Sequence, residues 1–456
     1  MRHLSVFAML CAGACLRAQS TPEIREILNR LQRLEDANHA LTDEVRSLRE
    51  QLATARGGAP ASAAAPPENV QEQLAVTKAR VEEMAQSKVE ASQKMPVRIT
   101  GMALFNTYLN GGFNANTENP VIASLTRADA TGGGSLRQST LGLQFESPQN
   151  FLGGKVTGSI YTDFFGGSAA SLNHLVRLRT ATISLDWDQT SILFGQDKPI
   201  ISPRDPNSLA QVGLSPLTDA GNLWLWQPQI RAERRFRFGT TAGFRAQIGV
   251  FQTREIGFEP TGYNFYSPPP PEATPNVEHA QPGVEGRFEL WKQWGENTRV
   301  EIASGFHENS SSVAGSDVSS HLYSIDWLIK PVRFVELTGF FYNGQNVANL
   351  GALPQGFTPG LYDHYRPVHS TGGWAQLRFP VTAKLAFDIF GGRQDDRNRD
   401  LLKGYIGLNQ AYYANVMYRL APNVLVSLEG GQVRTTFLGT GNRLNNHYDL
   451  AVAYLF

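Results

Sequence analysis

The chain ends in the stretch Tyr448-Asp-Leu-Ala-Val-Ala-Tyr-Leu-Phe456. Large apolar side chains occupy every second position of this stretch, at Tyr448, Leu450, Val452, Tyr454 and Phe456. Successive side chains of a β-strand point to opposite faces of the sheet. The stretch therefore predicts a strand that keeps one face apolar up to the last residue of the chain.

The same period of two extends back to Val97. In residues 155–164, lysine, threonine, serine, tyrosine and aspartate alternate with valine, glycine, isoleucine and phenylalanine, and residues 323–329 and 384–389 alternate similarly. In a membrane barrel this alternation is required, because side chains face lipid and lumen in turn. The sequence predicts an all-β transmembrane barrel of about 16 antiparallel strands over residues 96–456.

The connections between the predicted strands alternate between long and short. Long connections are expected near residues 110–134, 198–222, 254–282, 308–319, 343–369, 394–404 and 437–446, and a shorter one at 166–173. Short turns are expected at 147–150, 186–188, 238–240, 294–297, 330–331, 380–382 and 421–423. Short periplasmic turns and long outer loops are typical of outer-membrane barrels.

Aromatic residues gather near these short turns. They are Phe145, Trp187, Phe236, Phe238, Trp291, Trp294, Trp327, Phe379 and Tyr418. Tyrosine and tryptophan are enriched where a membrane meets water. We therefore expect an aromatic girdle at the short-turn end of the barrel.

Composition excludes several classes of protein. The 41 basic residues equal the 41 acidic ones, so no bulk charge points to nucleic acid. After the N-terminus no run of 18 or more apolar residues occurs, which excludes helical membrane spans. Residues 1–18 have the basic start, apolar stretch and small Ala18 of a signal peptide, and both cysteines lie within them. The mature chain is then expected in the cell outer membrane without disulfides.

Residues 19–56 have a helical period instead. Apolar residues dominate two heptad positions, at Ile24, Leu31, Asn38, Val45 and Leu52 and at Ile27, Leu34, Leu41 and Leu48. This narrow stripe predicts a coiled coil with a partner chain, located in the periplasm, although a helix packed on its own barrel is the alternative. Residues 57–67 are a Pro- and Ala-rich linker, and residues 68–95 form a weaker helical segment.

Three short motifs carry a resemblance to a known family. They are Leu175-Val-Arg-Leu-Arg-Thr-Ala-Thr-Ile-Ser-Leu, Leu193-Phe-Gly-Gln-Asp and Gln227-Pro-Gln-Ile-Arg231. With the order of segments, they resemble DcaP-like trimeric outer-membrane porins and, less closely, the phosphate-selective porins O and P. The resemblance implies a homotrimer for passive uptake of small anionic solutes. Asp197-Lys198 departs from the family, which usually has an aromatic or hydroxyl residue after the Gly-Gln pair.

The C-terminal stretch resembles the closing strand of bacterial outer-membrane proteins. In that group the terminal phenylalanine is recognised by the barrel assembly machinery. The resemblance therefore implies that Phe456 engages this machinery, with outer-membrane lipid as the other partner.

Arginines on two predicted strands are the candidate solute-binding residues. Arg177 and Arg179 lie on the fourth predicted strand, and Arg231, Arg235 and Arg237 lie on the sixth. Each set has a period of two, so each points to one face. An arginine facing lipid at mid-membrane costs about 2–4 kcal/mol, which favours the lumen. A basic wall suits carboxylates and phosphates, although a general-diffusion pore with no specific solute is an equal alternative.

The third outer loop, residues 198–222, is the candidate constriction. It contains Lys198, Arg204, Asp205 and Asp219, together with four prolines that stiffen it. In porins of this topology the corresponding loop folds inward, whereas an ordinary surface loop is the alternative.

No catalytic, metal-binding or cofactor-binding motif stands out in the sequence. The leading interpretation is therefore a porin for small hydrophilic, anionic solutes and not an enzyme. A structural tether that reaches the cell wall through the coiled coil is the second interpretation. An enzyme built into a barrel is the third.

Overall fold

The computed structural model of the chain describes residues 97–167, 174–252, 282–295, 297–313, 316–359 and 365–456. The expected signal peptide, coiled coil, linker and weak helical segment all lie outside these residues. None of the helices in the described residues is long and apolar enough to cross a membrane.

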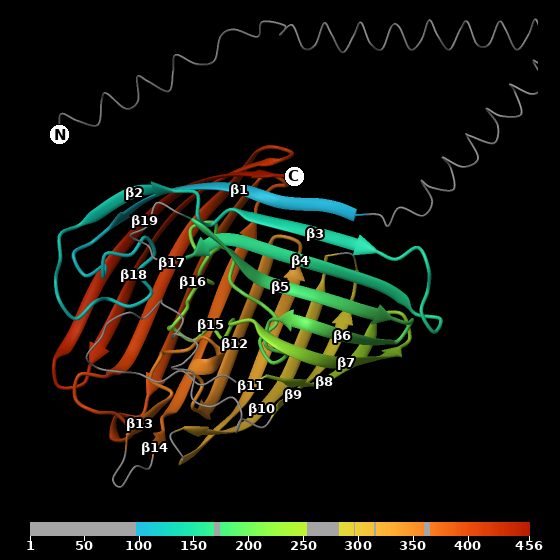
Figure 1. Ribbon diagram of the computed structural model, residues 1–456. Coiled ribbons are helices and arrows are strands. Elements are labelled where there is room, and N and C mark those ends of the chain that lie inside the picture. The colour runs from blue at the N-terminus through green and yellow to red at the C-terminus, as the bar shows by residue number, and fades with distance from the viewer. Residues whose placement is uncertain (1–96, 168–173, 253–281, 296, 314–315, 360–364) are drawn as a thin grey trace, which may run out of the picture. The chain divides into compact units, whose positions relative to one another are not determined.

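One large antiparallel sheet closes on itself (Figure 1). Its first wall contains β1 (Val97–Asn110), β2 (Thr131–Ser135), β3 (Thr140–Glu146), β4 (Lys155–Gly166), β5 (Leu175–Asp186), β6 (Thr190–Asp197), β7 (Gln227–Phe238) and β8 (Ala242–Phe251). The sheet continues through β9 (Gly283–Gln293), β10 (Arg299–Val313), β11 (Ser316–Val332), β12 (Val335–Gln345), β15 (His369–Pro380), β16 (Leu385–Asp396), β17 (Ile406–Ala421), β18 (Val424–Phe437) and β19 (Gly441–Leu455). Among the described strands, the short β13 (Phe357–Pro359) and β14 (Tyr365–Pro367) form a separate pair.

The 17 strands of this sheet correspond to 16 barrel strands. β2 pairs with residues 106–110 of β1, and β3 pairs with residues 97–102 of β1, so β2 and β3 are two parts of one interrupted barrel strand. The predicted antiparallel barrel of about 16 strands is therefore confirmed. Arg177 on β5 lies on the fourth barrel strand in chain order and Arg231 on β7 lies on the sixth, as the sequence predicted.

The barrel closes where β19 returns beside β1. Met102 pairs with Leu455, and the pairing continues to Asn110 with His447. The last residue takes part: the Phe456 amide donates to the Gly101 carbonyl at 3.1 Å, and the Gly101 amide donates to the Phe456 carbonyl at 2.9 Å. No strand edge is left at this seam.

Side chains alternate across the wall as the sequence pattern requires. On β19, Tyr448, Leu450, Val452 and Tyr454 are exposed on the outer face, whereas Asn445, His447 and Asp449 are buried on the inner face. Exposed apolar residues such as Ile302, Ile325 and Leu428 continue the outer face around the barrel. Trp291 is an exception to the expected girdle: it shares the inner face of β9 with the buried Glu289, and the Arg299 guanidinium lies over its ring.

The predicted short turns lie at or near their expected positions except the one at residues 330–331, which is wrong because β11 continues to Val332 and β12 begins at Val335. Two predicted long loops are wrong as well. Strand β10 extends to Val313 and β11 begins at Ser316, so residues 308–313 and 316–319 belong to strands and not to the expected long loop. Likewise only residues 438–440 separate β18 from β19, where residues 437–446 were expected to form a long loop. These strand ends carry polar residues on both faces. Because neither face is apolar, the alternation that predicts a strand is absent from the sequence there.

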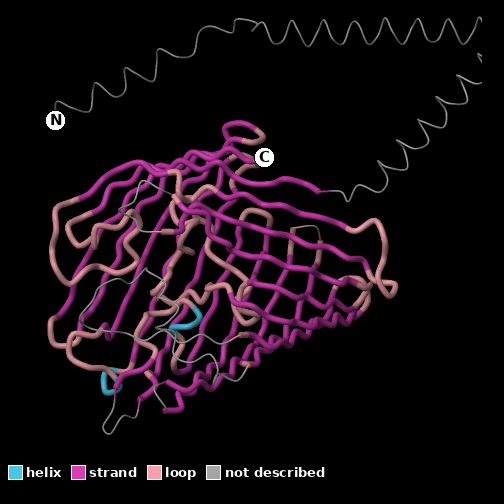
Figure 2. Tube along the Cα trace, in the orientation of Figure 1, coloured by secondary structure: helices cyan, strands magenta, loops and turns pink. Residues whose placement is uncertain are grey.

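Three long connections fold into the barrel (Figure 2). They are residues 111–130, residues 198–226, and a third connection described at residues 346–359 and 365–368, which contains the short 3₁₀ helix η3 (Ala348–Leu350). Ile201, Leu217 and Leu223 of the second connection form an apolar cluster with inward side chains of β12 to β18, including Phe340, Trp374, Phe390 and Tyr413. The Trp224 and Leu225 amides donate to the Leu350 carbonyl at 3.0 and 3.1 Å. The main apolar core of the described part is therefore inside the barrel. A second 3₁₀ helix, η4 (Asn398–Asp400), lies in the connection between β16 and β17.

Candidate functional site: the barrel interior

Residues 198–226, which we call the inner loop, contact several separate parts of the wall. The loop is longer than the predicted 198–222, because β7 begins only at Gln227. Arg204 forms ion pairs with Glu301 of β10 and Asp326 of β11, and its guanidinium lies 3.6 Å from the Glu289 carboxylate of β9. One side chain thus ties the loop to three neighbouring strands.

The inner loop is also tied to β15, β17 and β18. Asn207 donates to Gln376 at 2.8 Å, and Asn415 donates to the Asn207 carbonyl at 2.9 Å. The Ser208 hydroxyl donates to the Glu429 carboxylate at 2.6 Å. Polar side chains that face the lumen therefore find their partners in the loop backbone and side chains.

On the opposite side the loop meets the first predicted arginine pair. Arg177 donates to the Gly213 carbonyl at 2.5 Å, and Arg179 donates to the Val212 carbonyl at 2.9 Å. Both guanidinium groups also form ion pairs with the buried Asp163 of β4, at 2.6 and 3.4 Å. These arginines therefore lie on the inner face and position the loop.

Gly221 brings the loop backbone into direct contact with the wall. A Cβ atom at Gly221 would lie 2.3 Å from the Gly373 carbonyl oxygen and 2.6 Å from that of Arg393. The φ angle of Gly221 is +101°, a conformation that favours glycine. Conversely, a Cβ atom at Gly392 would lie 2.1 Å from the Ala220 carbonyl oxygen. Loop and wall thus approach to backbone contact, which only glycines permit.

The other loop residues singled out by the sequence stabilise the loop itself. Lys198 forms an ion pair with Asp205, to which Asn222 also donates at 3.2 Å. Burial opposes ionisation of Asp205, but the Lys198 ammonium and these hydrogen bonds hold the pKa of its carboxyl below the usual value. Asp219 is buried, and its carbonyl accepts a hydrogen bond from Asn409 of β17 at 2.9 Å.

The second predicted arginine set lies on the inner face of β7, and each member has an acidic partner. Arg231 lies 3.4 Å from Asp197, Arg235 lies 2.5 Å from Glu233, and Arg237 lies 3.6 Å from Asp188. The wall is therefore mixed in charge and not purely basic. The exposed Arg234 has the opposite parity, and its guanidinium lies over the ring of Phe236.

Sequence reasoning missed several inward-facing cations, most of them near the short-turn end of the strands. They are Arg245 of β8, Arg287 of β9, Arg299 of β10, Lys330 of β11 and Arg378 of β15. The same period of two could have found them, since each shares its parity with inward carboxylates. Arg287 alone is fully buried, between Glu289 and Asp326 at 2.7 Å from each.

Within these ion pairs the cation is usually the more accessible partner. The Arg235 side chain is 47% exposed, and its partner Glu233 only 8%. Arg299 and Glu301 are 42% and 5% exposed, and Arg245 and Glu289 are 29% and 1% exposed. The pairs of Arg231 and Arg237 are the reverse. A solute in the lumen would therefore meet guanidinium groups first at most of these pairs.

Solved structures show where this architecture occurs. The chain is similar to the outer membrane channel DcaP of Acinetobacter baumannii, with a TM-score of 0.62 and 14% identity over 79% of this chain and 97% of that one. It is also similar to an anion-selective porin from Comamonas acidovorans, with a TM-score of 0.52 and 13% identity over 80% and 100% of the two chains. OmpF of Salmonella typhi, solved with daunomycin, gives a TM-score of 0.52 and 10% identity over 80% and 98%.

These likenesses confirm the resemblance to DcaP at the level of the fold. No family model matches the chain, and no curated protein matches it either. Among the residues that the structure describes, no group of three or more histidine, cysteine, aspartate or glutamate side chains could hold a metal ion.

Proposed function

We propose that the protein is an outer-membrane porin for passive diffusion of small hydrophilic, anionic solutes. A closed barrel with an apolar outer face and polar side chains inside suits a membrane channel, because every backbone group is paired and no edge meets lipid. The short turns then face the periplasm, and the long connections face the outside. The likeness to solved porins supports the same interpretation.

The greater exposure of the cations carries the anion preference. At Arg235, Arg245 and Arg299 a guanidinium group faces the lumen, and its carboxylate partner lies behind it. A cation at the water-filled surface raises the local anion concentration more than a buried carboxylate lowers it, because electrostatic interactions weaken with distance. The exposed guanidinium groups therefore favour anionic solutes even where the two charges of an ion pair sum almost to zero.

Screening limits this selectivity unless the passage is narrow. The Debye length is about 8 Å at physiological salt, so a solute in a wide lumen would pass the arginines unaffected. The inner loop narrows the lumen in this proposal, since it contacts β5 at one side and β15 to β18 at the other. Solutes are then held within reach of the exposed guanidinium groups.

Reversal potentials under a KCl gradient test the preference. We expect the wild type to favour chloride, and the double variant Arg235→Gln with Arg245→Gln to lower the anion-to-cation permeability ratio about two- to fivefold. Arg234→Gln is the matched control, because it removes one charge from the outer face of the same strand. A cation-selective wild type would contradict the proposal, as would an equal effect of the control.

We further propose a homotrimer whose N-terminal coiled coils associate in the periplasm. The heptad stripe from Ile24 to Leu52 motivates the coiled coil. Deletion of residues 19–95 should lower the trimer fraction in detergent cross-linking if the helices drive assembly. Only monomers in the full-length protein would contradict the trimer, whereas trimers that survive the deletion would place the main contact on the barrel.

A further inference from the structure

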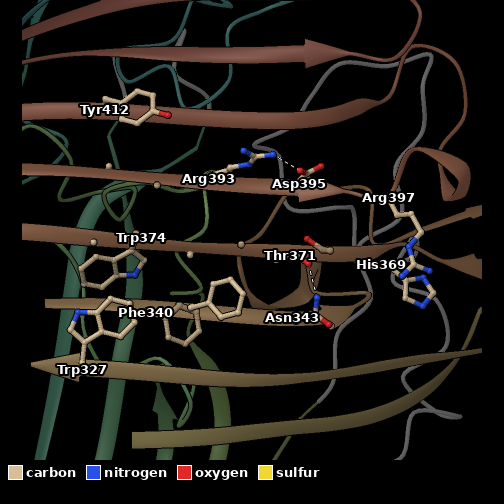
Figure 3. Close-up of a pocket in the computed structure, with 18 residues that line it drawn as sticks. Trp327, Phe340, Asn343, His369, Thr371, Trp374, Arg393, Asp395, Arg397 and Tyr412 are labelled. Atoms are coloured by element: carbon tan, nitrogen blue, oxygen red, sulfur yellow. Dashed lines mark hydrogen bonds and ion pairs between the residues drawn. The ribbon is translucent and has the colours of Figure 1, made fainter. Parts of the chain in front are cut away.

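A groove runs along the outer face of the barrel, on the opposite side of the wall from the inner loop (Figure 3). The cavity has a volume of about 780 Å³, and a second depression continues it toward Leu377 and Ile389. The groove is formed by strands β12, β15, β16 and β17. Because neighbouring strands lie about 4.8 Å apart, the groove is about 14 Å across from β12 to β17. It is separate from the lumen that the proposed channel uses.

The groove forms where β15 and β16 carry small residues on their outer face. The rings of Phe341 on β12 and Tyr412 on β17 are exposed on either side. Between them β15 and β16 present Gly373, Ala375 and Gly391 to the outside. Phe341 pairs directly with Gly373, and Tyr412 with Gly391, so the small residues of β15 and β16 lie between aromatic residues of the two flanking strands. Elsewhere on the outer face of the barrel, large apolar side chains are exposed.

The chemistry of the groove changes along its length. Leu337, Leu377, Ile389 and Ala414 line the end nearer the short turns. Asn343, Thr371 and Arg393 line the other end, where the Asn343 amide donates to the Thr371 hydroxyl at 2.6 Å. From Leu377 to Thr371 the strand rises about 20 Å. An apolar trough with a polar end of this length suits an acyl chain and its head group.

Charge at the polar end favours an anionic head group. Arg393 and Arg397 are exposed, and Arg393 forms an ion pair with the exposed Asp395. Within the described part of the chain Arg397 has no acidic partner, and His369 is paired with Asp400 at 2.8 Å. Two guanidinium groups against one carboxylate leave a net charge of +1. An arginine fork matches the geometry of a phosphate group.

We propose that this outer groove binds one anionic lipid of the outer leaflet, with an acyl chain along Gly373, Ala375 and Gly391 and the phosphate at Arg393. The proposal rests on the outer-membrane location proposed above. It does not depend on conduction, because none of these side chains faces the lumen. The polar end also lies toward the long connections, where outer-leaflet head groups would be.

Native mass spectrometry of the folded protein in detergent tests the groove, with phosphatidylglycerol, phosphatidylcholine and diphosphorylated lipid A as probes. We expect the wild type to retain one anionic lipid per subunit. Ala375→Trp should lower retention at least tenfold, because the indole would fill the groove. Arg393→Gln should weaken phosphatidylglycerol and lipid A about tenfold and phosphatidylcholine little.

Matched controls separate these effects from general changes of the surface. Ala232→Trp places the same ring on the exposed outer face of β7, and Arg434→Gln removes an exposed arginine of β18 outside the groove. Both should retain lipid as the wild type does. A heat-modifiable gel shift would show that each variant is folded.

Three results would overturn the proposal. They are unchanged retention in Ala375→Trp, equal retention of phosphatidylcholine and phosphatidylglycerol by the wild type, and loss of oligomers in Ala375→Trp, which would make the groove a contact between subunits. Conductance of the same preparations is measured in parallel. A wild type that binds lipid without conducting would refute the channel and leave the groove intact.

Discussion

Replacement of Gly221 by alanine tests how firmly the inner loop is seated. The new Cβ atom would lie 2.3 Å from the Gly373 oxygen, 2.5 Å from the Gly373 nitrogen and 2.6 Å from the Arg393 oxygen. All three are backbone atoms, so no side chain can rotate to make room. Overpacking of this kind costs about 1–3 kcal/mol, and the rigid surroundings favour the upper value. A φ angle of +101° adds about 1–2 kcal/mol for any L-residue with a side chain.

Gly404→Ala separates the two contributions. Gly404 has a φ angle of +90°, but an added Cβ atom would meet nothing within 4 Å. The difference between the variants is therefore the steric contribution of about 3 kcal/mol, which raises the ratio of displaced to seated loop about a hundredfold.

Single-channel recording in planar bilayers measures the effect. We expect Gly221→Ala to show larger mean conductance and more open-channel noise, because the loop leaves the lumen more often. Gly404→Ala should resemble the wild type. Identical traces for Gly221→Ala and the wild type would refute the reasoning, as would equal changes in both variants.

Two further predictions concern the seam and the loop. Gly101→Leu should lower the folded, heat-modifiable fraction several-fold, because an added Cβ atom would lie 2.5 Å from the Thr140 carbonyl oxygen of β3 and 2.6 Å from the ring of Phe456. Gly295→Leu, in open space, should not lower this fraction. Normal folding of Gly101→Leu would contradict the close packing at the seam. Because the pKa of Asp205 lies below its ordinary value, its ion pair with Lys198 stabilises the loop at neutral pH. This contribution declines once the pH falls below about 4 and is lost as the pH falls through the depressed pKa. Conductance should therefore rise on acidification through that range in the wild type and much less in Asp205→Asn; an equal rise in both would exclude a role for this ion pair.

The wall of the barrel could be predicted because its constraint is local. A residue such as Leu450 faces outward for reasons present within a few positions of it, since neighbours alternate between lipid and lumen. The prediction failed at residues 308–319 and 437–446, where the strands carry polar residues on both faces and local pattern contains no information.

The interior could be predicted only in part. The period of two placed Arg177 and Arg231 on one face of their strands. Their acidic partners come from neighbouring strands, and the register between strands cannot be predicted from the local sequence pattern. The contacts of the inner loop are more distant still. Asn207 meets Asn415, and Gly221 meets Gly373, only after the whole barrel has formed.

The seam has a consequence for biogenesis. Met102 of β1 pairs with Leu455 of β19, so β1 gains its second neighbour only once β19 has been synthesised. Until then the growing sheet exposes two unpaired edges, which are templates for association with other chains. Contacts of such long sequence separation also form slowly. Copies of an unfinished chain must therefore be kept apart until β19 pairs with β1, and a stop codon before β19 would remove the closing contact and leave two open edges.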